Sequence, residues 1–71
     1  MARMVKVIEL IAQSPTSWDD AAKVALAEAS KTIRGIRSIY VQDMTAIVEH
    51  DVITAYRIVA KVSFALDAAE D

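Results

Sequence analysis

The chain has no cysteine, and its 71 residues include only one glycine, one proline and one histidine. Without cysteine, neither a disulfide framework nor a thiolate zinc site can form. A single histidine, His50, excludes a metal site built from several histidines of one chain. A single glycine, Gly35, excludes a glycine-rich phosphate loop. Because very small domains usually depend on disulfides, metals or partner subunits, self-association is the simplest means of stabilisation left to this chain.

The chain also lacks a long apolar run and an excess of positive charge. No apolar run approaches the roughly 20 residues that a membrane-spanning helix needs. The first twelve residues are interrupted by Arg3, Lys6 and Glu9, so no cleavable signal is evident. The formal net charge is −2 and the basic residues are scattered, which argues against nucleic acid as the main partner. We therefore expect a cytoplasmic protein that binds neither nucleic acid nor membrane.

Hydrophobic residues, by contrast, are abundant. They make up 55% of the chain, and the mean hydropathy is positive. This is more apolar surface than a domain of this size can bury by itself. Other copies of the chain are the simplest cover for it, because large apolar patches on soluble proteins usually mark interfaces. The composition therefore predicts a single small domain that forms a symmetric homo-oligomer.

The first half of the chain predicts a strand and a helix. Residues 4–12 are aliphatic and β-branched, which is typical of a strand. Ser17 is a good N-cap for a helix over residues 18–34, with Asp20 placed three positions on as in a capping box. Gly35 follows as the residue expected to end this helix. Apolar residues recur along one face of the helix at Trp18, Ala21, Ala22, Ala25, Leu26, Ala29 and Ile33. The many alanines predict that a sheet packs closely against it.

The second half predicts a long hairpin. The period changes to two, giving strands over residues 36–48 and 52–66 with Glu49, His50 and Asp51 as the turn. The last strand alternates most clearly, and its helix-facing residues are expected to be Tyr56, Ile58, Ala60, Val62, Phe64 and Leu66. About fifteen residues span roughly 50 Å, more than one short helix can cover. We expect an α+β fold of order β-α-β-β, whose far end packs in another subunit.

Several short motifs in register resemble the dodecin family. They are VIEL in the first strand, SPTSWDDAA at the helix start, KTIR at its end and KVSF in the last strand. The resemblance extends from about Val5 to Asp67. It implies a three-stranded antiparallel sheet wrapped around one helix, and twelve copies assembled as a hollow homododecamer. The SPTSW entry and the run Gln42-Asp43-Met44 resemble the branch of the family that has been linked to calcium.

The resemblance also implies a flavin site, because many dodecins stack flavins such as FMN or riboflavin between tryptophans of neighbouring subunits. The position of that tryptophan falls on Ser38, and the position of a flavin-binding glutamine falls on Arg57. Asp43 matches a position from which a polar residue can approach the flavin, and Tyr40 is an alternative stacking platform. Loss of a stacking aromatic costs on the order of 1–3 kcal/mol per ring. The main flavin contacts are therefore altered in this chain.

Other residues are candidates for metal binding. Glu49, His50 and Asp51 have suitable donor atoms, and a three-fold axis would bring copies of the turn together, although a solvated hairpin turn is the favoured interpretation. Asp19, Asp20 and the acidic tail could offer oxygen ligands to calcium. Arg57 could bind an anionic ligand, but a salt bridge between subunits is the simpler interpretation.

Three functional hypotheses remain open at this point. The first is a small-ligand binding and storage shell of the flavin class, with an altered flavin site. The second is a shell that binds a metal ion, calcium in particular. The third is a structural scaffold without a small ligand. An enzyme is not expected, because no acid–base constellation is evident and no base can be assigned to Ser38 as a nucleophile.

Overall fold

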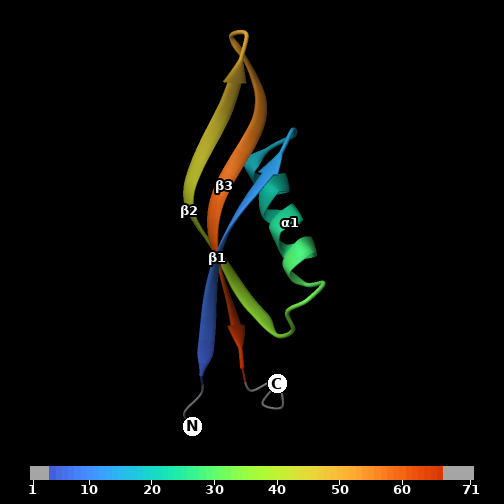
Figure 1. The fold of residues 1–71 in the computed structure, drawn as a ribbon, viewed down its shortest axis with the longest axis vertical. Helices are drawn as coiled ribbons and strands as arrows, with labels where there is room; N and C mark the ends of the chain where they lie inside the picture. Colours follow the sequence, from blue (N-terminus) through green and yellow to red (C-terminus); the bar gives the residue numbers. More distant parts are fainter. Residues whose placement is uncertain (1–3, 67–71) are drawn as a thin grey trace.

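The computed structural model describes residues 4–66, which form one helix and three strands. They follow the order β1 (Val5–Ser14), α1 (Trp18–Ala29), β2 (Ile36–Glu49) and β3 (Val52–Ala65). The strands form one antiparallel sheet in the order β1-β3-β2, and α1 lies against one of its faces (Figure 1). The predicted β-α-β-β fold is confirmed. Within residues 4–66, no helix is long and apolar enough to cross a membrane.

The molecule is elongated, with extents of 53 × 19 × 14 Å. The long axis follows the hairpin of β2 and β3, whose closed end extends beyond α1 (Figure 1). The predicted strand length of roughly 50 Å agrees with this shape. One short helix therefore covers only part of the sheet.

The inner face of the sheet packs on α1 through small and branched side chains. Ile58, Ala60 and Val62 of β3 are fully buried, as the alternation predicted. Opposite them lie Ala21 and Ala25 of α1, which are also buried and belong to the same core cluster. The alternation does not hold at the strand ends: Tyr56 and Phe64 are half-buried, and Leu66 is exposed because β3 ends at Ala65.

The start of α1 is tied to the end of β1 by hydroxyl groups. Ser17 is the N-cap, as predicted, and its Oγ accepts a hydrogen bond from the Asp20 amide at 2.9 Å. The second half of the expected capping box is not observed. The Asp20 carboxylate instead accepts a hydrogen bond from the buried Ser14 Oγ at 2.6 Å, and that hydroxyl accepts one from the Thr16 amide at 2.9 Å. The loop between β1 and α1 is thereby held at both ends.

The prediction that the helix continues to residue 34 was wrong, because α1 ends at Ala29. After Ala29 the backbone hydrogen bonds change to the closer spacing of a 3₁₀ turn. The amides of Lys31 and Thr32 donate to carbonyls three residues earlier, each at 3.2 Å. Thr32 and Ile33 are β-branched, which disfavours further helix. Gly35 has φ +73° and its carbonyl accepts a hydrogen bond from the Ala65 amide at 3.1 Å. This glycine therefore turns the chain into β2 rather than capping α1.

The first two strands end later than predicted, β3 ends one residue earlier at Ala65, and the turn is shorter. β1 continues to Ser14, because residues 13 and 14 still pair with β3. Glu49 pairs with Val52, so only His50 and Asp51 form the turn. Their φ values of 53° and 65° are both positive, as in the mirror-image turns that match the twist of a tight hairpin.

Candidate functional site

The residues predicted at the family flavin site lie on the face of the sheet that points away from α1. Side chains alternate along a strand, and Ile58, Ala60 and Val62 point to the helix, so their neighbours on β3 point the other way. We call this surface the outer face. By the strand register it comprises Val7, Glu9, Ile11 and Gln13 of β1, Arg57, Val59, Lys61 and Ser63 of β3, and Ser38, Tyr40, Asp43 and Thr45 of β2.

A β-bulge determines that Asp43 belongs to this face. The register of β2 shifts between Val41 and Asp43, so that Val41 pairs with Ala60 and Asp43 with the next residue of β3, Val59. One extra residue in a strand reverses the alternation beyond it. Tyr40 and Asp43 therefore share a face although they are three residues apart.

Ser38 uses its hydroxyl group within the sheet. Its Oγ lies 2.6 Å from the Oγ of Ser63, its direct partner across β2 and β3. A second hydroxyl is not a general base, so this pair offers no activated nucleophile. At the position where a flavin would need an aromatic plane, the chain therefore presents two small hydroxyls.

Arg57 is held on the central strand by a side chain of β1. Its Nε donates a hydrogen bond to Gln13 Oε1 at 3.0 Å, and Gln13 is its direct cross-strand neighbour. On the other side Arg57 pairs with Thr45. Because the guanidinium has five donors, the bond to Gln13 fixes its direction and leaves its terminal nitrogens able to donate to a carboxylate or another anion.

Tyr40 and Asp43 complete the set of predicted residues on this face. Both are exposed, and they lie opposite Lys61 and Val59, respectively. The structure thus brings Ser38, Tyr40, Asp43 and Arg57 together on one surface, as a polar strip with charges of both signs. The role of Tyr40 as a stacking platform stays a prediction.

The predicted metal residues lie at a different place. Glu49, His50 and Asp51 are exposed at the closed end of the hairpin. Within residues 4–66, no three His, Asp or Glu side chains are close enough together to hold a metal ion. Asp20 is engaged by Ser14, and the acidic tail from Asp67 lies outside the described residues.

The single tryptophan lies on the inner side of the sheet. Trp18 Nε1 donates a hydrogen bond to the Thr45 carbonyl at 3.2 Å, and its ring meets that of Tyr56 edge to face, with centroids 4.9 Å apart at 78°. It also packs against the core cluster. Trp18 therefore packs on the apolar face of the helix, as its place in the pattern predicted, and it lies on the side of the sheet away from the outer face.

Sequence reasoning missed two participants at the outer face, Ser63 and Gln13. Ser63 was placed on the correct face by the alternation, but its pairing with Ser38 depends on the register shifts of β2. Gln13 lay beyond the predicted end of the first strand. A longer strand would have placed it beside Arg57.

Comparisons with known proteins give consistent matches over nearly the whole chain. The family model described as Dodecin matches residues 4–67. The calcium dodecin of Mycobacterium tuberculosis is 37% identical over 65 residues, which is 92% of each chain. The crystal structure of that protein, described as calcium-chelating with a calcium-binding site, is 34% identical with a TM-score of 0.79, over 96% of this chain and 97% of the other. A mutant of the T. thermophilus dodecin is 27% identical with a TM-score of 0.87, over 93% and 98%.

Proposed function

This chain belongs to the dodecin family, and on that premise we propose that it is the subunit of a self-assembling shell that binds calcium rather than flavin. The proposed role is binding and storage without turnover. Self-assembly is supported by the apolar side chains that one chain leaves exposed. They lie along both edge strands, at the closed end of the hairpin, on the helix, and next to the outer ends of β1 and β3: Met4, Val5, Val7, Ile11, Val24, Leu26, Tyr40, Met44, Val48, Val52, Ile53 and Leu66.

The hydroxyl pair of Ser38 and Ser63 is the observation that carries the part of the proposal that concerns flavin. A stacked flavin gains binding energy from an aromatic plane, and at this position the two hydroxyls satisfy each other at 2.6 Å. The glutamine position is taken by Arg57, which cannot accept a hydrogen bond. The residues present therefore do not fit a flavin.

Calcium is supported by the calcium dodecin that matches this chain with 37% identity. Calcium takes six to eight oxygen ligands, so it needs several carboxylates or carbonyls around one point. One chain does not supply such a set within residues 4–66. We therefore place the ion between copies, with the carboxylates of Glu49 and Asp51 as donors. His50 would stand beside them without binding, because its nitrogen is a poor ligand for this hard cation.

The test is a calorimetric titration of the chelator-treated oligomer with calcium and, separately, with magnesium. We expect calcium to bind with fewer than one ion per chain, since copies share each site. The variant Glu49→Gln/Asp51→Asn keeps the size of both side chains, and asparagine tolerates the positive φ at position 51. It should lose calcium binding, whereas the control Asp19→Asn should retain it.

A parallel titration with riboflavin separates the alternatives. Quenching of riboflavin fluorescence by the unaltered protein, with no heat from calcium, would favour the flavin class. An oligomer that responds to neither ligand would support the structural scaffold. If calcium binds but Glu49→Gln/Asp51→Asn does not weaken it, the ion lies elsewhere in the shell.

A further inference from the structure

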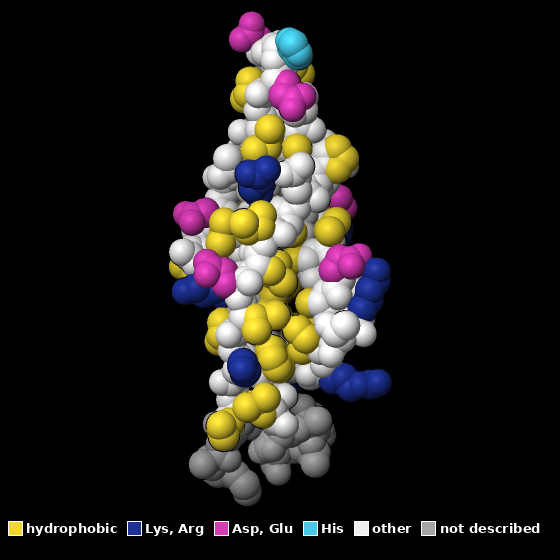
Figure 2. Space-filling model, viewed as in Figure 1, with side chains coloured by type: hydrophobic (Ala, Val, Ile, Leu, Met, Phe, Trp, Pro, Cys, Tyr) yellow, Lys and Arg dark blue, Asp and Glu magenta, His cyan; other side chains and the backbone are white. Residues whose placement is uncertain are grey.

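Charged side chains are spread singly over the surface, with basic and acidic ones interspersed (Figure 2). Apolar side chains gather where α1 meets the sheet in the same view. The formal net charge of the whole chain is −2. A broad positive field is therefore not what would hold an anion on this protein. An anion needs a place where several hydrogen-bond donors converge on one point.

Three donor side chains form one row across the outer face. Gln13 of β1 and Thr45 of β2 both pair directly with Arg57 of β3, so each strand contributes one side chain to the row. We call these three residues the donor row. All three are exposed. Neighbouring strands lie about 4.8 Å apart, so an anion above Arg57 is within reach of the side chains on both sides of it.

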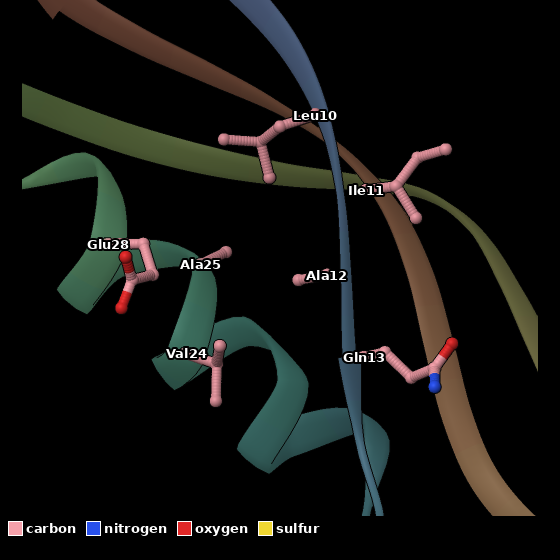
Figure 3. A pocket seen from close by; sticks show the side chains of 7 residues that line it. All are labelled: Leu10, Ile11, Ala12, Gln13, Val24, Ala25 and Glu28. Carbon is pink, nitrogen blue, oxygen red and sulfur yellow. The ribbon is translucent and has the colours of Figure 1, made fainter.

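Gln13 joins the row because of the direction in which β1 points its side chain. A groove of about 300 Å³ lies between β1 and α1, and Leu10 and Ala12 point towards it from the strand. Gln13 borders the groove but directs its amide the other way, across β3 (Figure 3). Its Oε1 accepts the hydrogen bond from Arg57 Nε at 3.0 Å. Because arginine only donates, the amide oxygen faces the guanidinium, and the amide nitrogen can donate to a ligand.

The Arg57 guanidinium has a fixed direction and further donors. Its Nε is bound to Gln13, and the two terminal nitrogens carry the other four of its five N–H groups. These nitrogens form the planar fork that binds two oxygens of one anion. A side chain that is already ordered loses less conformational freedom when a ligand binds.

Thr45 is the member of the row on β2, and its backbone is held from the other side of the sheet. The Thr45 carbonyl accepts the hydrogen bond from Trp18 Nε1 at 3.2 Å, which joins this part of β2 to α1. The hydroxyl is a separate group of the same residue, on the outer face. Its hydrogen rotates to suit a partner, so it can donate to an anion bound by Arg57.

The charges around the row make Arg57 the cation suited to an anion. Lys61, the other basic residue of β3 on this face, has Glu9 as its direct cross-strand neighbour. The donor row itself contains no acid. By the strand register, Asp43 is the acid beside the row, because it pairs with Val59 and lies one diagonal step from Arg57. Asp43 opposes an anion without occupying its place.

We propose that Gln13, Arg57 and Thr45 form a binding site for a phosphate group, either free phosphate or a phosphate monoester. Arg57 binds two of its oxygens, and the Gln13 amide nitrogen and the Thr45 hydroxyl donate from the two sides. A tetrahedral phosphate has oxygens for all of these donors, whereas a planar carboxylate presents both of its oxygens to Arg57. The site lies apart from the calcium residues proposed at the closed end of the hairpin, and it takes a different class of ligand.

Equilibrium dialysis of the assembled protein against radiolabelled inorganic phosphate tests the site. The protein is first treated with a chelator and dialysed, so that no calcium phosphate forms. We expect up to one phosphate per chain. Arg57→Gln should weaken binding roughly tenfold or more, because it removes charge-assisted hydrogen bonds. Arg57→Lys keeps the charge but not the planar fork, so it should weaken binding as well.

Lys61→Gln is the matched control, because it removes the same charge from the same strand and face. It lies four residues from Arg57, or roughly 13 Å, where salt screens most of its effect. It should leave phosphate binding nearly unchanged. Asp43→Asn removes the acid beside the row and should raise the affinity about threefold at low salt. Circular dichroism and light scattering confirm that each variant is folded and assembled. Equal losses in Lys61→Gln and Arg57→Gln would show that charge alone attracts phosphate, which overturns the site.

Competition with unlabelled ligands separates the sources of the phosphate group. Displacement of the label by less glycerol phosphate than inorganic phosphate indicates a monoester, and the reverse indicates the free ion. Acetate that competes as well as phosphate would overturn the choice of phosphate over carboxylate. Absence of bound label overturns the inference altogether. If Arg57→Gln then also has a lower mass by light scattering, Arg57 pairs instead with a carboxylate of another copy.

Discussion

At the scale of single residues, the outer face is defined by what Ser38 and Arg57 bind within the sheet. The Ser38 hydroxyl is satisfied by Ser63, and the Arg57 guanidinium is held by Gln13. Ser38 offers no flat surface on which an aromatic ligand could stack, so such a ligand gains little binding energy at that position. Both still present polar groups to solvent, and an ion or a neighbouring carboxylate is the more suitable partner.

Restoring the family residues at these two positions should create flavin binding. The variant Ser38→Trp/Arg57→Gln introduces a stacking ring and a side chain that can both donate and accept hydrogen bonds. Stacking contributes about 1–3 kcal/mol, so affinity for riboflavin should rise roughly five- to 150-fold. The measurement is quenching of riboflavin fluorescence during titration with protein. Ser38→Ala/Arg57→Ala is the control and should show no gain. If the unaltered protein binds riboflavin as tightly as Ser38→Trp/Arg57→Gln, positions 38 and 57 are not the ones that determine flavin binding.

At the scale of elements, the contact between α1 and the sheet depends on small side chains. Ala21 and Ala25 are 0% and 2% exposed and lie in one cluster with Ile58 and Ala60. A helix can lie this close only where alanine lines its buried face, since larger residues would push the layers apart. Ala25 also lines the groove beside β1, together with Ala12 of β1. The small size of alanine therefore contributes both to the close helix–sheet contact and to the open groove.

Enlarging one of these alanines should destabilise the fold. Ala21→Leu inserts three carbons where no space remains, and such overpacking costs about 1–3 kcal/mol. The measurement is urea unfolding followed by the fluorescence of Trp18, which packs against the same cluster. Ala27→Leu is the control, because residue 27 is exposed and leucine is nearly as good a helix former as alanine. If both variants unfold at the same urea concentration, the close helix–sheet contact is not what stabilises the fold.

At the scale of the whole molecule, one chain is too elongated to protect its own apolar surface. A body of 53 × 19 × 14 Å has little interior, and within residues 4–66 only Ile58 and Val62 among the larger apolar side chains are almost fully buried. Small domains bury a smaller fraction of their surface than large ones and are correspondingly marginal. The exposed edge of β1, the closed end of the β2–β3 hairpin and the outer face would all gain from burial between copies.

The family to which the chain belongs implies a shell of twelve copies, so the assembled protein should have a mass of about twelve times the 7.8 kDa of one chain. Light scattering coupled to size-exclusion chromatography measures it. Because folding and association are linked, the midpoint of thermal unfolding should rise with protein concentration. A midpoint that does not depend on concentration, together with the mass of one chain, would contradict the dodecin-type shell for this protein.

Much of this structure follows from local patterns in the chain. The order of the elements, the N-cap at Ser17 and the buried positions Ile58, Ala60 and Val62 follow from helix capping and from periods of 3.6 and two residues. These signals act between residues close in sequence, so a single sequence can show them. The absence of tryptophan at Ser38 likewise follows from the residue type and the family resemblance, without any geometry.

Contacts between distant segments were decided only by the tertiary structure. Arg57 is bound by Gln13, which is 44 residues away, and Ser38 by Ser63, 25 residues away, because the strand register makes each pair neighbours. The bulge in β2 turns Asp43 to the outer face, and the tightened hydrogen bonds after Ala29 end α1 before Gly35. The groove exists only because α1 and β1 meet at their alanines. Local propensity determines which helices and strands form. Which side chains meet is determined by strand register and by packing, because register and packing depend on the whole sheet at once.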